Sequence, residues 1–392
     1  MNCPACSTPE ERRFYAQRDV PVNSCLLLQS PGEAGSLPRG SLELAWCAAC
    51  GFVWNAAFDP AQAEYSPRYE ETQSFSEHFS SFARDLAKRW VDQYDLHGGT
   101  VLEIGCGKGE FLVAMMEAGA GRGVGIDPGT HPERLEAPAA SRIEWIVDFY
   151  GERYAAVRAD AVVCRHTLEH IQPVAEFVGT VRRSIGDRRD VVVLFEVPDV
   201  ARVLEEAAFW DVYYEHCSYF TAGSLARLFR AEGFEVLDAR LEYDDQYVVV
   251  EARPAVASGA VGPQVPSAVE DDLDRLAAGV ESFPAAIDQA VDGWRRRITE
   301  VTASGGRAVI WGAGSKGVAF LQALGPCGVD LAVDINPHKH GTYLPGGAQR
   351  VVAPEHLQAE PPDLVVAMNP VYVPEIQRDL RRLGVEPQLV AV

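Results

Sequence analysis

The stretch Thr100-Val-Leu-Glu-Ile-Gly-Cys-Gly-Lys-Gly109 decides the fold of this chain. Its apolar start has the pattern of a short buried strand, and the segment that follows, 110–119, has the pattern of a helix. Gly105, Gly107 and Gly109 stand at the junction, where residues without a Cβ let the backbone turn tightly and lie against a ligand. Their spacing, G-x-G-x-G, differs from the G-x-G-x-x-G of nicotinamide-binding folds.

Two acidic residues flank this glycine turn. Glu103 precedes it by two residues, and Asp127 ends the next apolar strand, 123–126, where a ribose diol can be held. A glycine trio alone also occurs in turns that only pack a helix on a strand. Together with the two acids, however, the turn resembles the S-adenosylmethionine (SAM) site of class I methyltransferases. We therefore expect SAM to be the cofactor.

Alternating strands and helices continue after Asp127 and predict an α/β fold with a doubly wound parallel sheet. The strand at 143–149 ends near Asp148 and Phe149, and we expect Asp148 to face the adenine amino group. Further strands are predicted at 159–164 and 191–197. A helix over 223–233 and two antiparallel strands, 234–237 and 246–252, would close this domain, and a helix over 76–96 would lead into it.

Two histidines follow the fourth predicted strand. Because open α/β sheets bind ligands at the carboxyl ends of their strands, His166 and His170 are expected at the mouth of the site. We assign His166 to the cofactor site and His170 to the substrate. The alternative is that either ring is an ordinary structural hydrogen-bond donor.

A second group of polar side chains lies in the segment Phe209-Trp-Asp-Val-Tyr-Tyr-Glu-His-Cys-Ser-Tyr-Phe220. His216 is the residue in it whose unperturbed pKa lies near neutrality, as a general base requires. Tyr213 and Glu215 are candidates to fix its tautomer or to hold a substrate oxygen. The alternative is that the aromatic residues fill a core and that Glu215 and His216 cap a helix.

Two CxxC pairs, Cys3-x-x-Cys6 and Cys47-x-x-Cys50, have the spacing of a tetrahedral zinc site. Four cysteine ligands leave no open position on the ion, so the site is expected to be structural. An iron–sulfur cluster uses the same ligands, and four unrelated buried thiols are a further alternative. Cys25 lies outside the pairs and is expected to be a small core residue.

Composition narrows the class of protein. The formal net charge of −21 over 392 residues offers no basic surplus for a nucleic-acid partner. No apolar run reaches the length of a membrane span, and the first residues do not form a signal peptide. Nine cysteines, partly in CxxC pairs, fit a reducing cytoplasm better than a disulfide framework.

The C-terminal third predicts a smaller Rossmann-like domain. A linker is expected over 254–267 and a helical stretch over 269–304, interrupted near Pro284. The strand 307–311 leads into Gly312-Ala-Gly-Ser-Lys-Gly317, which matches G-x-G-x-x-G, and Asp334 closes the next strand. Taken alone, this C-terminal domain would suggest a nicotinamide-dinucleotide-binding module. However, the roughly 86 residues that follow from Arg307 are too few for a complete dehydrogenase. A purely structural role for the glycines also remains open.

Four residues are candidates to bind the substrate. Lys316 stands at a helix start, where it can meet a diphosphate, and Asn369 and Tyr372 follow a predicted strand that ends at the same cleft. Tyr69 belongs to a polar and aromatic segment, 65–74, that is either a lid or an ordered surface loop.

The order of a four-cysteine segment, a SAM domain, a Tyr-x-Glu-His segment and a glycine-rich C-terminal domain resembles the nucleotide-sugar C-methyltransferases. The resemblance implies methylation of a keto-sugar nucleotide on the carbon next to its carbonyl, with His216 as the base, Tyr213 and Glu215 beside it, and His170 near the substrate. It also implies that the C-terminal domain helps to hold the substrate. The chain departs from the family pattern at 243–247 and at Glu71, both on expected substrate-facing loops.

The sequence thus predicts a zinc-binding segment at 1–75, a SAM-dependent methyltransferase domain at 76–253, a linker and helical segment at 254–304, and a Rossmann-like substrate-binding domain at 305–392. We expect C-methylation of a nucleotide-linked keto-sugar by a cytoplasmic monomer or small homo-oligomer. An O- or N-methyltransferase of another small biosynthetic molecule is the first alternative, and the dinucleotide-binding module is the second.

Overall fold

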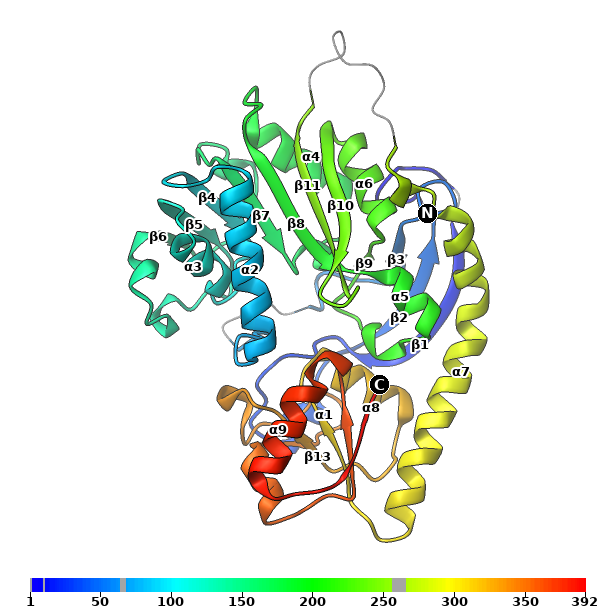
Figure 1. Cartoon of the computed structure of the whole chain (residues 1–392). Helices are drawn as coiled ribbons and strands as arrows, with labels where there is room; N and C mark the ends of the chain where they lie inside the picture. The colour runs from blue at the N-terminus through cyan, green and yellow to red at the C-terminus, as the bar shows by residue number, and fades with distance from the viewer. Residues whose placement is uncertain (1, 10, 64–67, 256–265) are drawn as a thin grey trace.

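The computed structural model describes residues 2–9, 11–63, 68–255 and 266–392. Its strands form a four-stranded, a seven-stranded and a five-stranded sheet. The seven-stranded sheet lies in the upper part of Figure 1 and the five-stranded sheet in the lower part, with the four-stranded sheet beside them on the right. The predicted lid at 65–74 and the predicted linker at 254–267 fall partly outside the described residues.

The N-terminal sheet is antiparallel and has the order β1-β2-β3-β9. Its strands are β1 Arg12–Pro21, β2 Arg39–Trp46, β3 Val53–Asn55 and β9 Ser218–Tyr219, and the short helix α1 Pro31–Gly35 lies between β1 and β2. The last strand comes from the segment directly after His216, with Tyr219 opposite Val53. The N-terminal sheet is therefore hydrogen-bonded to the segment that carries the expected base. The domain boundary predicted at residue 75 does not separate the two in space.

The central sheet has the order β10-β11-β8-β7-β4-β5-β6. Its first five strands in chain order are parallel, and β11 and β10 close it in antiparallel fashion, as predicted. The strands are β4 Thr100–Ile104, β5 Arg122–Ile126, β6 Ile143–Ile146, β7 Ala161–Arg165, β8 Val192–Pro198, β10 Phe234–Glu242 and β11 Tyr247–Pro254. The third strand ends three residues earlier than predicted, so Asp148 and Phe149 lie in the loop after it.

Alternation along the central strands explains why helices cover both faces of this sheet. Val101 and Val163 pack on one face with α2 and α3, whereas Leu102 and Val162 pack on the other with α4 and α6. The helices are α2 Glu77–Gln93, α3 Glu110–Glu117, α4 Val174–Ile185, α5 Val200–Glu206 and α6 Ala222–Ala231. The doubly wound sheet predicted from the strand and helix pattern is confirmed.

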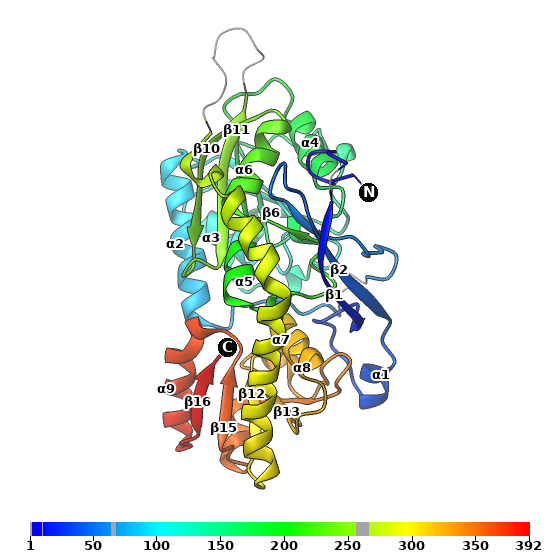
Figure 2. The same ribbon diagram turned by 90° about the vertical axis from the view of Figure 1, so that its right-hand side faces the viewer.

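A single helix, α7 Leu273–Ala303, runs beside all three sheets (Figure 2). The predicted interruption near Pro284 is wrong, because the helix continues through that residue. Val280, Phe283 and Ile287 on either side of the proline are buried in the large core that also contains residues of the N-terminal sheet. Burial of this face outweighs the one backbone hydrogen bond that the proline removes.

The C-terminal sheet is parallel, with the order β14-β13-β12-β15-β16. Its strands are β12 Ala308–Trp311, β13 Leu331–Val333, β14 Arg350–Val352, β15 Leu364–Ala367 and β16 Gln388–Ala391, and its helices are α8 Ser315–Leu324 and α9 Val373–Leu383. It is a small Rossmann-like unit, as predicted.

Short 3₁₀ helices occupy several connections. They are η1 Pro132–Arg134, η2 Pro138–Arg142, η3 Glu152–Tyr154, η4 Leu168–His170, η5 Phe209–Asp211, η6 Ala268–Glu270, η7 Pro337–Lys339, η8 Pro354–Gln358 and η9 Pro370–Tyr372. None of the helices in the described part of the chain combines the length and the apolar character needed to cross a membrane.

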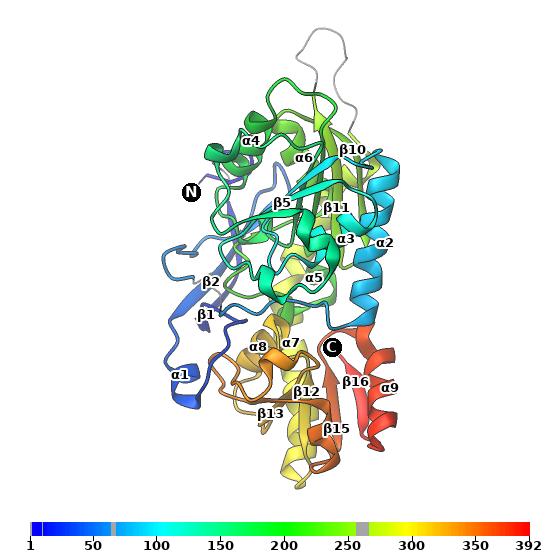
Figure 3. The same cartoon turned by 90° about the vertical axis from the view of Figure 1, so that its left-hand side faces the viewer.

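The C-terminal unit contacts the central domain at the N-terminal end of α2 (Figure 3). The carboxylate of Glu375 on α9 accepts hydrogen bonds from the Ser76 hydroxyl, at 2.7 Å, and from the backbone N–H of His78, at 2.9 Å. Phe209 and Phe320 stack across the same junction with ring centroids 5.7 Å apart. These contacts place the C-terminal unit against the carboxyl ends of the central strands.

Candidate functional site

A cavity of about 1160 Å³ lies between the carboxyl ends of the central strands and the C-terminal unit. It is larger than the roughly 300–1,000 Å³ that a single small ligand usually needs, so it has room for a cofactor and an acceptor together. Fourteen of the residues predicted for the site line it: Tyr69, Glu103, Gly105, Gly107, Asp127, Asp148, Phe149, His166, His170, Tyr213, His216, Lys316, Asn369 and Tyr372. Gly109 and Glu215 are predicted site residues that do not line it.

The glycine turn is tight, as predicted, and its three glycines have left-handed backbone. The φ angles of Gly105, Gly107 and Gly109 are +68°, +52° and +89°. A Cβ on Gly105 would lie 2.0 Å from the Thr167 hydroxyl oxygen, and one on Gly109 would lie 2.3 Å from the Trp145 ring. Glycine is therefore required at both positions, for packing as well as for the turn.

Glu103 is a buried acid on the cavity wall. Burial raises the pKa of its carboxyl to about 8. Its Oε2 atom has no hydrogen-bond partner among the described residues, and a buried polar atom without a partner is costly unless a ligand satisfies it. An ammonium group such as that of SAM fits this position, because it would both pair with the carboxylate and satisfy the oxygen.

The two aspartates beyond the glycine turn differ in their surroundings. Asp127 accepts hydrogen bonds from the backbone N–H of Gly107, at 3.1 Å, and of Gly129, at 2.6 Å, which fixes it beside the turn. Asp148 is held by the Tyr154 hydroxyl, which lowers the pKa of its carboxyl. It lies at the cavity edge with Phe149, whose side chain is exposed.

Tyr213 and His216 form a hydrogen-bonded pair inside the cavity. The Tyr213 hydroxyl lies 2.8 Å from Nε2 of His216. Burial, together with the positive charges of His170, His166 and Lys316, holds the pKa of His216 well below its usual value. Burial also raises the pKa of Tyr213 well above its usual value. The pair is therefore neutral at physiological pH, and the phenol can either donate to Nε2 or accept a hydrogen bond from it.

Glu215 lies elsewhere than predicted. Its carboxylate accepts hydrogen bonds from the Asn23 amide, at 3.0 Å, and from the backbone N–H of Ser24, at 2.9 Å. The N-terminal segment therefore binds this side chain, and only its backbone carbonyl reaches the site, 3.0 Å from Nδ1 of His170. Asn23 and Ser24 had no signal in the sequence, because they are about 190 residues away from Glu215.

His166 belongs to a buried ionic network. Its Nε2 lies 2.9 Å from Oε1 of Glu196, and its Nδ1 lies 3.7 Å from Oε1 of Glu169. Burial alone would lower the pKa of His166, but the two carboxylates outweigh it and raise the pKa to about 9. Arg165 also binds Glu196, at 2.7 Å. One signal for this network was available in the sequence, since Glu196 interrupts the apolar run of β8.

The predicted substrate residues from the C-terminal unit line the cavity but also hold the two domains together. Lys316 lies 2.9 Å from a carboxylate oxygen of Asp211, and the side-chain amides of Asn369 and Gln246 exchange hydrogen bonds of 2.9 and 3.0 Å. The Tyr372 hydroxyl donates to Gln73 at 2.9 Å. No sequence pattern indicates these partners, because each comes from a distant segment of the chain.

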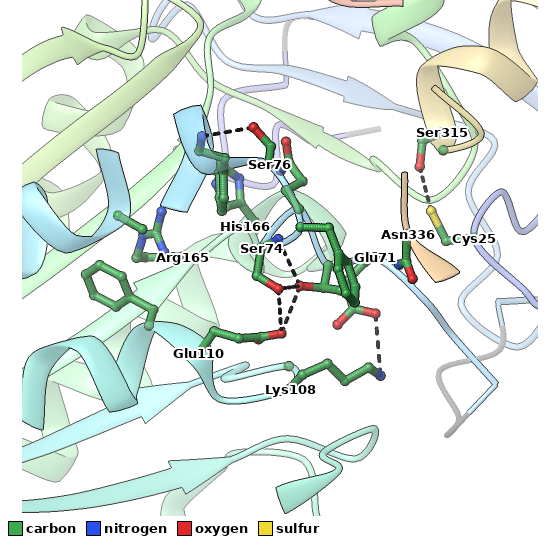
Figure 4. Close-up of a pocket in the computed structure, with 18 of the residues that line it drawn as sticks. Cys25, Glu71, Ser74, Ser76, Lys108, Glu110, Arg165, His166, Ser315 and Asn336 are labelled. Carbon is green, nitrogen blue, oxygen red and sulfur yellow. Dashed lines mark hydrogen bonds and ion pairs between the residues drawn. The ribbon is translucent and has the colours of Figure 1, made fainter. Parts of the chain in front are cut away.

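The segment after Tyr69 covers the glycine turn. Figure 4 shows Glu71 and Lys108 pointing toward each other in the cavity, with 3.6 Å between charged atoms. Burial raises the pKa of Glu71 to about 7. The hydroxyls of Thr72 and Ser74 donate to Glu110 at the start of α3, at 2.9 and 3.2 Å. The backbone carbonyl of Tyr69 accepts from Lys108 at 2.8 Å.

Side chains of the C-terminal unit itself stabilise its glycine-rich turn. Asp334 accepts hydrogen bonds from the backbone N–H groups of Ala313 and Asn336, each at 2.8 Å. The Lys339 ammonium donates to the Ala313 carbonyl at 3.1 Å, and a Cβ on Gly317 would lie 2.4 Å from the Gly312 carbonyl. These contacts fix Asp334 beside its glycine-rich turn, as Asp127 is fixed beside the turn of the central domain.

The four paired cysteines meet at one point, away from the cavity. The sulfurs of Cys3 and Cys50 are 3.7 Å apart, and those of Cys6 and Cys47 are 3.6 Å apart. A tetrahedral zinc ion with bonds of about 2.3 Å needs sulfurs about 3.8 Å apart. The thiol set therefore fits a zinc ion closely.

Comparisons with known proteins agree with this arrangement. Residues 73–239 match the family described as "Methyltransferase domain", and residues 250–386 match "C-methyltransferase C-terminal domain". The C-methyltransferase NovU of Streptomyces niveus is 29% identical over 306 residues, which span 75% of this chain and 72% of NovU.

Two solved structures are more distantly similar. The 1,6-didemethyltoxoflavin-N1-methyltransferase of Burkholderia thailandensis is 18% identical, with a TM-score of 0.34, over 46% of this chain and 82% of that protein. The magnesium protoporphyrin IX methyltransferase of Synechocystis is 14% identical, with a TM-score of 0.34, over 47% of this chain and 86% of that protein.

Proposed function

Because this chain is a SAM-dependent methyltransferase that joins a class I methyltransferase domain to a C-methyltransferase C-terminal domain, we propose that it methylates a carbon next to a ketone. The acceptor that we propose is a nucleotide-linked keto-sugar, and the general base is His216. The observation that carries this proposal is the hydrogen bond between Tyr213 and His216 in the same cavity as the glycine turn.

The SAM site that we propose is built on the glycine turn. The partnerless carboxylate oxygen of Glu103 would take the ammonium group, and Asp127 would take the ribose. Gly105, Gly107 and Gly109 give the turn its shape, while Asp148, Phe149 and His166 are proposed cofactor contacts at the cavity wall. When bound, SAM supplies an electrophilic methyl group that needs no further activation.

His216 has the properties of a base for a carbon acid. Its lowered pKa keeps the ring neutral, and among the described residues no hydrogen-bond partner contacts its Nδ1 atom. In the tautomer in which Nε2–H donates to the Tyr213 oxygen, Nδ1 holds the lone pair that removes the α proton. The Tyr213 O–H then remains available to donate to the oxygen of the enolate.

The rest of the cavity would orient the acceptor. His170 lies next to His216, with ring centroids 4.9 Å apart, and in its doubly protonated form its Nε2–H would be a second donor for the enolate oxygen. Lys316 would meet the diphosphate, and Asn369, Tyr372 and Tyr69 would contact the nucleotide or sugar. Holding acceptor and methyl donor in one cavity supplies much of the rate, because it removes the entropic cost of their encounter.

We also propose that Cys3, Cys6, Cys47 and Cys50 hold a structural zinc ion. The distances between their sulfurs support this assignment. Free thiolates persist in a reducing compartment, which supports a cytoplasmic location.

Hydrogen exchange tests the function directly. The enzyme is incubated in deuterated water with a panel of keto-sugar nucleotides, first with S-adenosylhomocysteine and then with SAM. We expect one acceptor to exchange its α proton and then to gain a methyl group on that carbon. His216→Ala should lose both reactions and keep its affinity for SAM.

Full turnover by His216→Ala would overturn the base assignment. A product methylated on oxygen or nitrogen, with no exchange at carbon, would show that the chain belongs to the O- or N-methyltransferases instead.

A further inference from the structure

Three side chains of the cavity wall meet at one point: Glu169 and His170 from η4, and His216 from the loop before β9. One ligand atom from each lies within 4.8 Å of the other two. We infer that these three residues bind a divalent transition-metal ion, in a second metal site that is separate from the four cysteines. The ion enters the cavity when the acceptor is absent and inhibits the enzyme.

His170 is oriented as a metal ligand. Its Nδ1 lies 3.0 Å from the backbone carbonyl of Glu215, and a carbonyl oxygen can only accept a hydrogen bond. In its neutral form the ring therefore carries its proton on Nδ1 and its lone pair on Nε2. Metal-ligating histidines commonly show this arrangement, in which the second nitrogen donates to a backbone carbonyl.

The two imidazoles lie at a distance that one ion can bridge. The ring centroids of His170 and His216 are 4.9 Å apart, and the rings are nearly perpendicular, at 81°. With metal–nitrogen bonds of about 2.1 Å, two histidine ligands of one zinc ion need their nitrogens within about 4.2 Å. Small rotations of the side chains are enough to reach that spacing.

Glu169 supplies the negative charge. Its side chain is 2% exposed, and neither carboxylate oxygen has a hydrogen-bond partner among the described residues. An ion pair links it to His166 at 3.7 Å, but the same ring lies closer to Glu196, at 2.9 Å. These contacts offset little of the free energy that a carboxylate loses when it is removed from water. A cation that reaches its oxygens would therefore stabilise it.

The ligand set selects the class of ion. Two imidazoles and one carboxylate suit zinc, cobalt and nickel, whereas magnesium and calcium prefer sites made of oxygen atoms. Three protein ligands leave coordination positions open toward the cavity, unlike the closed set of four cysteines.

Bound metal would block the reaction. Coordination by His216 takes the lone pair that the proposed base needs, so the ion and the acceptor exclude each other. This consequence rests on the proposed function, but the binding of the ion does not, and the two are measured separately.

Cobalt binding tests the site. Wild-type protein that retains zinc on its cysteines is titrated with Co²⁺ by calorimetry and by visible absorption. We expect one equivalent of Co²⁺ with the weak d–d bands of a nitrogen and oxygen site, without the strong bands of thiolate ligands. Glu169→Gln and His170→Ala should each weaken this binding at least about 10-fold, as expected for loss of a ligand.

His97→Ala is the matched control. His97 and Asp92 form an exposed pair 3.1 Å apart on the surface, which can also attract a metal. Loss of the Co²⁺ equivalent in this variant would overturn the inference, as would binding that persists in both ligand variants. SAM titrations show whether the variants are folded.

Zinc inhibition is the second measurement. Added Zn²⁺ should raise the KM for the acceptor in wild-type protein and leave the KM for SAM unchanged. If no acceptor is methylated at all, the proposed function fails, while the cobalt titration still decides the metal site. An unchanged KM for the acceptor at saturating Zn²⁺ would contradict the inhibitory role.

Discussion

The hydroxyl of Tyr213 lies 2.8 Å from Nε2 of His216, and no other hydrogen bond to this imidazole is found in the described part of the chain. The phenol therefore holds the ring of the proposed base in place through Nε2. The loop that carries both residues is fixed at one end by η5 and at the other by β9, which pairs with the N-terminal sheet.

Tyr213→Phe removes this partner and should lower kcat about 10- to 100-fold, as expected for loss of a buried hydrogen bond worth about 1–3 kcal/mol. The KM for SAM should not change, because the phenol lies outside the proposed cofactor contacts. Steady-state kinetics measure both. Tyr219→Phe is the control, since within the described residues that hydroxyl donates to the Tyr213 backbone alone, at 3.3 Å. Equal losses in the two variants would argue against a specific role.

SAM binding should depend on pH through Glu103. Its pKa of about 8 means that the free protein holds this carboxyl mainly protonated at pH 7. If the SAM ammonium needs the carboxylate, binding releases the proton, and the affinity rises with pH until the pKa is passed. The rise approaches about 10-fold per pH unit well below pH 8.

Calorimetry in buffers of different ionisation enthalpy measures this proton release. Glu103→Gln should abolish the release and weaken SAM binding. Affinity that is flat between pH 6 and 8 in the wild-type protein would contradict the assignment of Glu103 to the ammonium group.

Glu215→Ala should destabilise the fold more than it impairs the chemistry. It removes the buried carboxylate that accepts from the Asn23 amide and from the Ser24 backbone N–H, at a cost of about 3 kcal/mol. Urea unfolding measures the loss, and a double-mutant cycle with Ser24→Ala should reveal coupling between the two residues.

The conservative variant Glu215→Gln separates stability from catalysis. It should keep most of the turnover, in contrast to the roughly 10²- to 10⁴-fold loss expected on removal of a general base. A loss in Glu215→Gln as large as in His216→Ala would restore the catalytic role that the sequence suggested.

Loss of zinc should unfold the N-terminal sheet and also slow the reaction. Cys47→Ser is expected to lose the ion and to lower the free energy of unfolding by about 3 kcal/mol or more. Activity should fall as well, because β3 of this sheet pairs with β9, directly after His216. Metal analysis, urea unfolding and turnover are measured together.

Cys25→Ala is the control for the zinc variant, because Cys25 lies outside the cysteine cluster. It should keep one zinc per chain. A Cys47→Ser protein of unchanged stability would show that the four thiols do not hold a structural ion.

Local patterns explain what could be read from the sequence. Apolar alternation, the glycine spacing and the CxxC pairs act over a few residues, so the doubly wound sheet, the tight turn at 105–109 and the cysteine cluster were all predictable. The break expected at Pro284 did not occur, because the cost of one missing hydrogen bond is local while the burial of Phe283 and Ile287 depends on distant partners.

The sequence by itself determined the fold class, the strand ends that carry polar residues and the pairing of the cysteines in two CxxC motifs, since each follows from short-range patterns along the chain. Only the tertiary structure decided which side chains meet. Ser24 reaches Glu215, Asn369 reaches Gln246, and Glu169 comes beside His216, across 47 to 191 residues of chain. Such partners depend on how separate sheets pack against one another, and no local pattern records that packing.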